Sequence, residues 1–271
     1  MQYLKKLLDF YINSSIHVAI SVYALVKMTQ FMFAISDNSF IGYFAFFGTI
    51  VGYNFVKYDA LARVKKDPMS KQLKIIAVLS FLSLIATAYF FLKLHIISKS
   101  IALAFLILTM LYTLPFFPNT NNARNWAGVK IYIVTLCWVG VTVILPVINA
   151  AVPLTIDVLL IVLQRFILVF VLILIFEIID LKKDDPHLLT VPQQIGVMQT
   201  KIAGSILLFI FIMLEFLDTD YRHQALLLKS GIALTVFLFL LFANDKRSKY
   251  YTSFWAESVP LLWWILLLIF G

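Results

Sequence analysis

The sequence predicts an all-helical integral membrane protein, a single bundle of nine transmembrane helices with a cytoplasmic N-terminus. Of its 271 residues, 62% are hydrophobic and 13% are charged, whereas soluble domains are roughly 45–50% apolar and about 25% charged. The mean hydropathy of +0.95 agrees with this class. Two further observations support a helical membrane protein. The chain contains long apolar runs, and its Lys and Arg residues are distributed unequally among the loops. We therefore expect one transmembrane domain over residues 1–271.

The apolar runs define the expected helices, because a membrane-spanning helix needs about 20 predominantly apolar residues. The runs are too long and too uniformly apolar for the alternating strands of a membrane barrel. Residues 1–10 have an amphipathic pattern and are expected to lie at the membrane interface. Nine spans are expected to follow, at about 13–35, 39–58, 73–93, 98–117, 128–149, 155–180, 201–218, 226–243 and 254–270.

The basic residues predict the orientation of the bundle. With the N-terminus inside, Lys93, Lys99, Arg222 and Lys229 fall in outside segments, and sixteen of the 22 Lys and Arg residues fall in inside segments. This asymmetry is typical of the positive-inside rule. Removing one interior helix would invert every later loop, so the bias favours an odd number of spans. The net charge of +8 is explained in this way and indicates no nucleic-acid partner.

Few polar residues lie inside the apolar runs, and each needs an explanation. The single cysteine, Cys137, excludes a disulfide framework and a cysteine metal site. Lys27 and Arg165 are cations within spans, where each costs about 2.5–3.5 kcal/mol unless it is paired or reaches the interface. For Arg165 we expect one of two arrangements. It extends to the outer surface, or it pairs with Glu215 near the outer end of the seventh span.

The acidic stretch at 176–196 contains the strongest candidate site. Glu177, Asp180 and Asp184 fall within about 60° of one another on a helix. Three carboxylates on one face repel unless a metal ion, a group of Lys and Arg side chains, or water lies between them. The alternative is a solvated helix end, with Lys182 and Lys183 as neighbours. Glu177 lies one turn deeper, and a carboxylate at membrane depth is a functional candidate by default.

The order of residues in this stretch resembles a known motif. Asp180-x-x-x-Asp184, followed by Thr190-x-Pro192 and Gly196, is similar to the second aspartate-rich motif of UbiA-type intramembrane prenyltransferases. That family has nine transmembrane helices and carries one such motif after helix 2 and one after helix 6, both on the cytoplasmic side. The segment at 111–115, with Lys130 beyond it, also resembles the family pattern. We identify the sequence as a divergent relative of this superfamily.

The resemblance implies a function and a location. It implies transfer of a prenyl group from an isoprenyl diphosphate to a lipid-soluble acceptor, with Mg²⁺ assistance, at the cytoplasmic face of a bacterial inner membrane. Mg²⁺ prefers oxygen ligands and is commonly shared between carboxylates and substrate phosphates. The acceptor stays open among a quinone precursor, a haem, a glycerol phosphate lipid and a small polyprenyl compound.

The resemblance also assigns roles to individual residues of this chain. Metal binding is implied for Asp180 and Asp184, with Asp59 contributing from the other loop. Orientation of the acceptor, or stabilisation of the allylic cation, is implied for Glu177 or Tyr112. Contact with the diphosphate is implied for Asn54, Lys57, Arg124, Lys130 and Lys183.

The first aspartate-rich motif of the family is degenerate here. Asn54 is in place, but Tyr58 and Ala62 occupy the positions where acids are expected. Asp59 lies about 140° around a helix from Asn54. The alternative to metal binding by Asp59 is a local ion pair with Arg63. For Asn54 the alternative is a hydrogen bond between helices. Lys57 either replaces one metal charge or pairs with an aspartate of the second motif in a protein without transferase activity.

Two other functions are alternatives to the prenyltransferase. The first is a catalytically impaired protein of the same fold that binds a lipid or a partner. The second is a small transporter, for which the expected signs are an internal repeat or matched broken helices. Neither sign is visible. Glu257, at the start of the ninth span, is a further acid that would join a polar site on the cytoplasmic side.

Overall fold

The computed structural model describes residues 2–36, 40–64, 70–114, 128–218 and 223–270, with the backbone alone at 2 and 59–64. Tyr112 and the acidic stretch lie within these residues, whereas Arg124 and the side chain of Asp59 lie outside them. The described chain consists of helices and their connections. The main helices are α1 (Gln2–Asn13), α2 (Ile16–Met32), α3 (Phe40–Val64), α4 (Lys71–Lys93), α5 (Ile96–Thr113), α6 (Val129–Val139), α7 (Leu145–Asn149), α8 (Ile156–Asp180), α9 (Val191–Met213), α10 (His223–Phe242) and α11 (Val259–Phe270).

Seven helical segments are long and apolar enough to cross a membrane. Two of them combine several elements. The π-helical turn η3 (Gly140–Ile144) joins α6 to α7, and η6 (Tyr251–Trp255) with η7 (Ala256–Ser258) leads into α11. The apolar helix α2 is shorter, at 17 residues, and α3 has 25. An integral membrane helical fold is therefore supported, while the count of nine spans and the orientation stay predictions.

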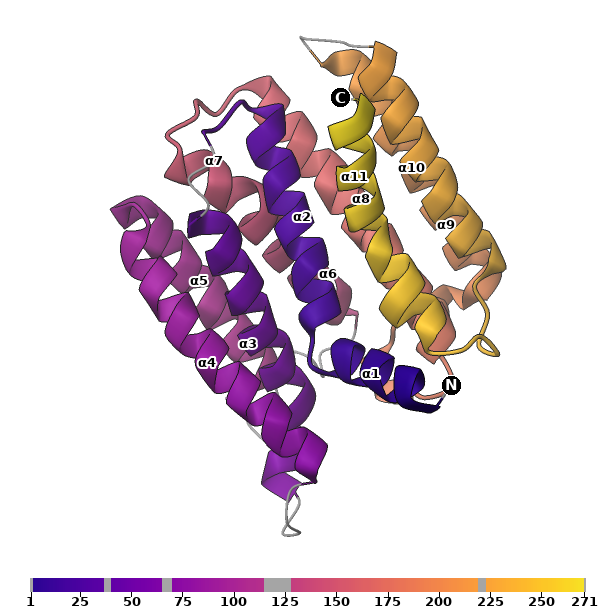
Figure 1. The fold of residues 1–271 in the computed structure, drawn as a ribbon. Coiled ribbons are helices and arrows are strands. Elements are labelled where there is room, and N and C mark those ends of the chain that lie inside the picture. The colour runs from indigo at the N-terminus through magenta and orange to yellow at the C-terminus, as the bar shows by residue number, and fades with distance from the viewer. Residues whose placement is uncertain (1, 37–39, 65–69, 115–127, 219–222, 271) are drawn as a thin grey trace.

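The helices form an elongated bundle with one helix across its end. In Figure 1, α2 to α5 lie on one side and α8 to α11 on the other, and α1 runs across the end where the chain begins. The bend between α1 and α2 lies at Ser15, whose φ of 61° is left-handed and stops the helix. We call this end of the bundle the α1 end. The turn between α8 and α9 lies there too, because Lys182 and Asp9 both contact the loop that precedes α11.

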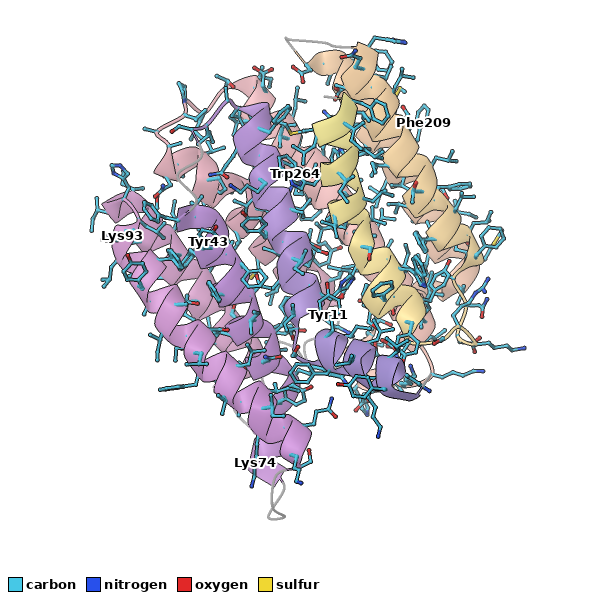
Figure 2. All side chains as sticks on the ribbon, in the orientation of Figure 1. Tyr11, Tyr43, Lys74, Lys93, Phe209 and Trp264 are labelled. Atoms are coloured by element: carbon cyan, nitrogen blue, oxygen red, sulfur yellow. The ribbon has the colours of Figure 1, made fainter. Side chains whose placement is uncertain are left out.

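The packing places α8 at the centre and α4 at the edge. Most of α8 is buried, and its apolar side chains pack against α2, α9, α10 and α11 around Trp263 and Phe211. In contrast, only Ile76 and Ser83 are buried in α4. Its exposed apolar side chains would face lipid. Lys74 and Lys93 mark opposite ends of this outer helix in Figure 2.

Buried charges at the other end of the bundle pair differently from the sequence expectation. Glu215 forms an ion pair with Lys229, not with Arg165, and both members of the pair are almost fully buried. Gln164 joins them, accepting a hydrogen bond from Lys229 and donating one to Glu215 at 3.1 Å. Arg165 instead donates to the carbonyl of Leu25 at 3.2 Å and lies against the ring of Trp263.

Helix geometry explains why Arg165 does not pair with Glu215. Gln164 and Arg165 are consecutive and project about 100° apart on a helix. Gln164 therefore faces η5 (Leu214–Leu217) and α10, whereas Arg165 faces α2 and α11. Arg165 is 1% exposed, so it does not extend to the surface.

Candidate functional site

The acidic stretch forms the turn from α8 into α9, and its backbone is fixed by several hydrogen bonds. Asp184 N donates to the carbonyl of Asp180 at 2.9 Å, which continues the helical turn beyond the end of α8. Asp185 Oδ1 accepts from His187 N at 2.9 Å. Gln193 Oε1 accepts from Thr190 N at 2.9 Å, and Gln193 Nε2 donates to the carbonyl of Asp185 at 3.3 Å. The motif residues are thus held on an ordered turn.

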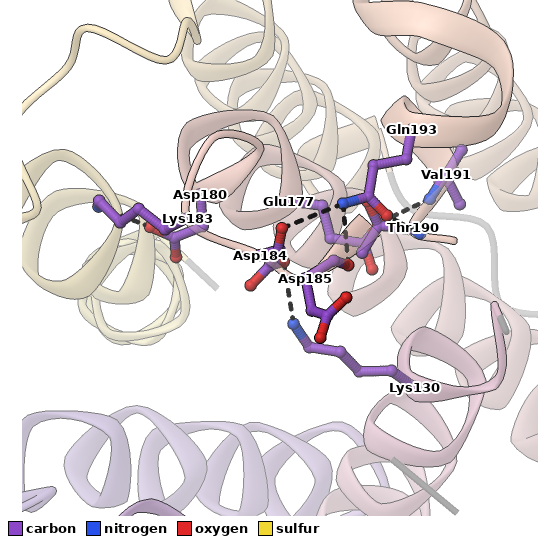
Figure 3. Close-up of polar contacts among 9 residues, drawn as sticks. All are labelled: Lys130, Glu177, Asp180, Lys183, Asp184, Asp185, Thr190, Val191 and Gln193. Carbon is purple, nitrogen blue, oxygen red and sulfur yellow. Dashed lines mark hydrogen bonds and ion pairs between the residues drawn. The ribbon is translucent and has the colours of Figure 1, made fainter. Parts of the chain in front are cut away.

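Glu177 connects the two helices below this turn. Its side chain is 2% exposed, and Oε2 accepts a hydrogen bond from Val191 N at 3.0 Å (Figure 3). Val191 is the first residue of α9, so the carboxylate lies at the positive end of that helix dipole. This contact gives Glu177 an anchoring role in the structure. A direct role toward an acceptor stays a prediction.

The two aspartates of the motif each contact a lysine. Asp184 Oδ2 lies 3.5 Å from Lys130 Nζ, and Asp180 Oδ1 lies 2.8 Å from Lys183 Nζ. Figure 3 shows Asp184 turned toward Lys130, with the Asp180 and Lys183 pair lying apart from it. The four predicted residues therefore form two ion pairs, in which Asp180, Lys183 and Asp184 belong to the turn and Lys130 comes from the start of α6. Lysine side chains thus supply a counter-charge to both aspartates.

Burial differs between the two ion pairs. The side chain of Asp184 is 17% exposed and that of Asp180 is 39% exposed. Asp184 Oδ2 is buried and accepts no hydrogen bond from the residues that the structure describes. The 3.5 Å separation from Lys130 compensates its charge without a close hydrogen bond. Asp184 thus keeps an oxygen that a ligand or cation could engage.

Asn54 is engaged in hydrogen bonds between helices. Its Oδ1 accepts from Ser15 Oγ at 2.8 Å, and its Nδ2 donates to the carbonyl of Ser14 at 3.1 Å and to Ser80 Oγ at 2.8 Å. The side chain is 3% exposed. Asn54 therefore links α3 to the α1–α2 bend and to α4. These contacts agree with the alternative in which Asn54 forms hydrogen bonds between helices. Its contact with a diphosphate stays a prediction.

Lys57 also contacts the α1–α2 bend. Its Nζ donates to the carbonyl of Asn13 at 3.3 Å and to Asn13 Oδ1 at 3.4 Å, and the hydroxyl of Tyr58 donates to the same carbonyl at 2.8 Å. Both side chains therefore satisfy the carbonyl at the last residue of α1. One of the two alternatives for Lys57 is an ion pair with Asp180 or Asp184; among the described residues these aspartates pair with Lys183 and Lys130 instead.

A second group of polar and aromatic side chains lies inside the bundle. Trp138 Nε1 donates to the hydroxyl of Tyr53 at 2.6 Å, and Tyr53 interacts electrostatically with Tyr112, Cys137 and Glu257. We call these five residues the Tyr53 cluster. The predicted Tyr112 and Glu257 both interact with Tyr53 in this cluster. Sequence reasoning missed Tyr53 and Trp138 because isolated aromatics in spans indicate only packing or interface contacts, and their pairing links α3 with α6.

Ion pairs connect the segments at the α1 end. Lys182 Nζ lies 2.6 Å from Asp245, and Lys249 Nζ lies 2.7 Å from Asp9. Hydrogen bonding from Lys182 lowers the pKa of Asp245. Hydrogen bonds from Lys249 and Tyr250 likewise lower the pKa of Asp9. The loop between α10 and α11 thus contacts both α1 and the acidic turn.

The described residues contain no preformed group of three His, Cys, Asp or Glu side chains suited to a metal ion. Asp180 and Asp184 nevertheless lie on one turn, and Asp184 Oδ2 lacks a hydrogen-bond donor. Mg²⁺ is usually held by one or two carboxylates together with phosphate oxygens and waters. This donor set therefore fits Mg²⁺ that arrives with a diphosphate better than a resident metal.

Comparison with solved structures supports the fold. A digeranylgeranylglyceryl phosphate synthase in membranes, a UbiA-type membrane prenyltransferase, is similar to this chain with a TM-score of 0.55. The similarity covers 99% of this chain and 97% of that chain at 15% sequence identity. No protein-family model matches the chain, and no curated protein matches it. At this identity the similarity shows a fold like that of a UbiA-type prenyltransferase, as the resemblance of the acidic stretch implies.

Proposed function

We propose that the protein transfers a prenyl group from an isoprenyl diphosphate to a lipid-soluble acceptor in a bacterial inner membrane, with its site at the cytoplasmic face. The observation that carries this proposal is the acidic turn. It presents Asp180 and Asp184 with Lys183 and Lys130, next to the end of the largely buried apolar helix α8. A prenyl diphosphate has the matching form, a polyanionic head on a long apolar tail.

The lysines suit the head group. A diphosphate carries several negative charges, and ammonium groups form strong charge-assisted hydrogen bonds to phosphate oxygens. Lys183 is 65% exposed and Lys130 is 23% exposed, so both are accessible to an incoming anion. On binding, each lysine would exchange its aspartate for a phosphate oxygen. The aspartates released in this way would then need a cation.

Asp180 and Asp184 are the residues that would hold that cation, with the substrate phosphates completing the ligand set. Bound Mg²⁺ would supply neutralisation of the diphosphate as it leaves, which favours breaking the allylic carbon–oxygen bond. Lys130 and Lys183 would hold the departing diphosphate at the turn. Arg124, Asp59, Asn54 and Lys57 remain proposed contacts from the other side of the site.

A second candidate function is binding of a phosphorylated isoprenoid without transfer. The hydrogen bonds of Asn54 favour it, because they join this residue to Ser14, Ser15 and Ser80 inside the bundle. The hydrogen bonds of Lys57 to Asn13 favour it as well. In this case the acidic turn would bind the phosphorylated head group, whereas Asn54 and Lys57 would hold the helices together.

The experiment uses the purified protein in lipid nanodiscs with radiolabelled isoprenyl diphosphates of several lengths, Mg²⁺ and a membrane lipid extract. Labelled lipid and released diphosphate are the expected products. Asp184→Asn should abolish turnover, and Asp245→Asn is the matched control because it makes the same change at another ion pair of the α1 end. Diphosphate binding is measured separately. Binding without turnover supports the second candidate, and neither binding nor turnover at any length overturns both.

A further inference from the structure

Arg165 is a buried cation in α8 that takes no part in the ion pairs of the described residues. Its side chain is 1% exposed. A guanidinium stays protonated in proteins, so this position carries a full positive charge. A buried charge is costly unless it is compensated. The ion pairs found in the described part of the chain are all formed by lysines, namely Lys130, Lys182, Lys183, Lys229 and Lys249.

The contacts that Arg165 does make compensate its charge only in part. Its Nη1 donates to the carbonyl of Leu25 at 3.2 Å, and the same oxygen also accepts from Thr29 Oγ1 at 3.1 Å. The Cζ atom of Arg165 lies 5.8 Å from the centre of the Trp263 ring, which is within the range of a cation–π interaction. A shared carbonyl and a ring face carry partial charges, so neither replaces a counter-ion.

Two hydrogen-bond donors of this contact also lack acceptors. Arg165 Nη2 and Trp263 Nε1 are both buried, and neither has a hydrogen-bond partner in the part of the chain that the structure describes. The Trp263 side chain is 2% exposed. Arginine and tryptophan side chains only donate hydrogen bonds, so they cannot satisfy each other. Buried donors without partners are rare in native proteins. A group that satisfies these two must therefore accept hydrogen bonds.

We propose that Arg165 and Trp263 bind a small monovalent anion, chloride, between α2, α8 and α11. The ion would accept hydrogen bonds from Arg165 Nη2 and Trp263 Nε1 and would neutralise the guanidinium. The nearly complete burial of both side chains favours a small ion over a larger anionic ligand. Glu215 does not supply the negative charge, because it pairs with Lys229. The site is separate from the acidic turn, since Asp180 lies ~22 Å further along α8.

The bound ion would connect three helices of the bundle. Leu25 belongs to α2, Arg165 to α8 and Trp263 to α11, and Leu25 and Trp263 lie in one cluster of buried apolar side chains. A ligand that binds only the folded protein stabilises it as the ligand concentration rises. We therefore expect chloride to stabilise the bundle. This inference does not depend on the proposed function.

Chloride binding tests the site directly. Radiolabelled chloride would be titrated against the purified protein in lipid nanodiscs, with sodium gluconate holding the ionic strength constant. Binding should saturate, and bromide but not gluconate should displace the label. Arg165→Gln should weaken binding at least tenfold, because it removes a charged hydrogen-bond donor. Trp263→Phe keeps an aromatic ring but removes the N–H group, and should weaken binding by a smaller factor.

Arg247→Gln is the matched control. Arg247 also donates to a backbone carbonyl, that of Phe242, and lies over an aromatic ring, that of Tyr251, but its side chain is exposed. The same substitution there should leave chloride binding unchanged. Loss of binding in Arg247→Gln together with normal binding in Arg165→Gln would place the ion elsewhere and overturn the inference.

Thermal unfolding provides a second readout that needs no folded Arg165 variant. The midpoint temperatures of the wild type and Arg247→Gln should be higher in sodium chloride than in sodium gluconate of equal ionic strength. The difference between the two salts should be smaller for Trp263→Phe. A wild type that neither binds chloride nor gains stability from it overturns the inference and indicates that a neutral acceptor such as water satisfies the two donors. Equal chloride affinity in Trp263→Phe, Arg165→Gln and the wild type overturns it as well.

Discussion

At the scale of single residues, Asn54 shows how one position supports two interpretations. Its sequence context resembles a family motif, and an asparagine at the end of an apolar span is also a common bridge between helices. The three hydrogen bonds to Ser14, Ser15 and Ser80 come from segments up to 40 residues away. No spacing rule relates such distant positions, so sequence alone left both alternatives open.

Replacing Asn54 with Ala should therefore destabilise the protein more than it affects ligand binding. Interhelical hydrogen bonds in membrane proteins contribute about 0.6 kcal/mol each on average and up to about 1.7 kcal/mol. With three bonds lost, we expect about 1–3 kcal/mol of destabilisation, measured by reversible unfolding in mixed micelles. Diphosphate affinity should change less than twofold. A variant of normal stability with much weaker diphosphate binding would instead show that Asn54 contacts the ligand.

The buried pair of Glu215 and Lys229 gives a second prediction at this scale. Lys229→Met leaves the Glu215 carboxylate buried without its cation, which costs about 3–5 kcal/mol in comparable cases. The double variant Lys229→Met with Glu215→Gln removes the unpaired charge and should recover most of that loss. Unfolding free energies of the two single variants and the double variant form the measurement. Additive losses in the double variant would show that the two residues do not act as a pair.

At the scale of elements, the apolar runs predicted helix positions well where a sharp polar boundary exists. The sixth run was expected to end at 180, and α8 ends at Asp180. The seventh was expected from 201, yet α9 begins at Val191, ten residues earlier. Polar residues occupy this first part, and Gly196 adopts a φ of 82°, which kinks the helix there without ending it. A glycine tolerates this conformation at little cost.

The amphipathic segment expected at 1–10 corresponds to α1, which extends to Asn13. Its apolar face includes Tyr3, Leu4 and Leu7, which are exposed and suited to the membrane interface. The contacts that α1 makes through Asp9 could not be predicted from the sequence, because they involve a loop about 240 residues away. Asp9 binds Lys249 at 2.7 Å and Tyr250 at 2.8 Å. These bonds hold α1 across the end of the bundle.

The position of α1 should therefore depend on pH through Asp9. Hydrogen bonds from Lys249 and Tyr250 hold the pKa of Asp9 below its ordinary value of 3.8. A carboxylate with a lowered pKa stabilises the docked helix above its ordinary pKa, and this contribution is lost as pH falls through the lowered value. We expect α1 to remain docked from pH 7 to about pH 4 and to loosen below that range.

A spin label at Lys6→Cys, in a Cys137→Ser background, measures this motion. Label mobility should stay constant down to about pH 4 and then rise. In the Asp9→Asn variant, mobility should already be raised at pH 7 and change little on acidification. Asp245→Asn serves as the matched control, because Asp245 pairs with Lys182 and not with α1. The same pH profile in Asp9→Asn and the parent protein would exclude Asp9 as the responsible group.

At the scale of the whole molecule, composition and apolar runs were sufficient to predict a helical membrane bundle, because hydropathy reports burial in lipid directly. The acidic stretch was also recognisable, since its residues are close in sequence. The Tyr53 cluster was not, because Tyr53 and Trp138 lie 85 residues apart and meet only through packing of α3 and α6. Sequence reasoning thus identified the acidic turn, which one segment forms, together with Tyr112 and Glu257, but it missed the contact between Tyr53 and Trp138.

The orientation of the bundle remains the broadest prediction, and pairs of engineered cysteines test it. Lys74 and Lys93 are exposed at opposite ends of α4, whose 23 residues span about 35 Å. Leu154 and Lys182 flank α8 in the same way and are also exposed. In a Cys137→Ser background, each of these positions would carry a single cysteine. A membrane-impermeant maleimide added to intact cells should label Lys93→Cys and Leu154→Cys but not Lys74→Cys or Lys182→Cys.

Reporters fused to each end of the chain complete the test of the span count. With nine spans the two ends lie on opposite sides, so an N-terminal fluorescent protein and a C-terminal alkaline phosphatase should both be active. An inactive phosphatase together with the expected cysteine labelling would leave an even number of spans. Lys182 and the C-terminus would then lie on the same side, so one of α9, α10 and α11 would not span. An inactive N-terminal fluorescent protein with the expected labelling would instead leave one span before Lys74, and α2, with 17 residues, would be the helix to reassign. The reverse labelling pattern would place the acidic turn outside and contradict a cytoplasmic site.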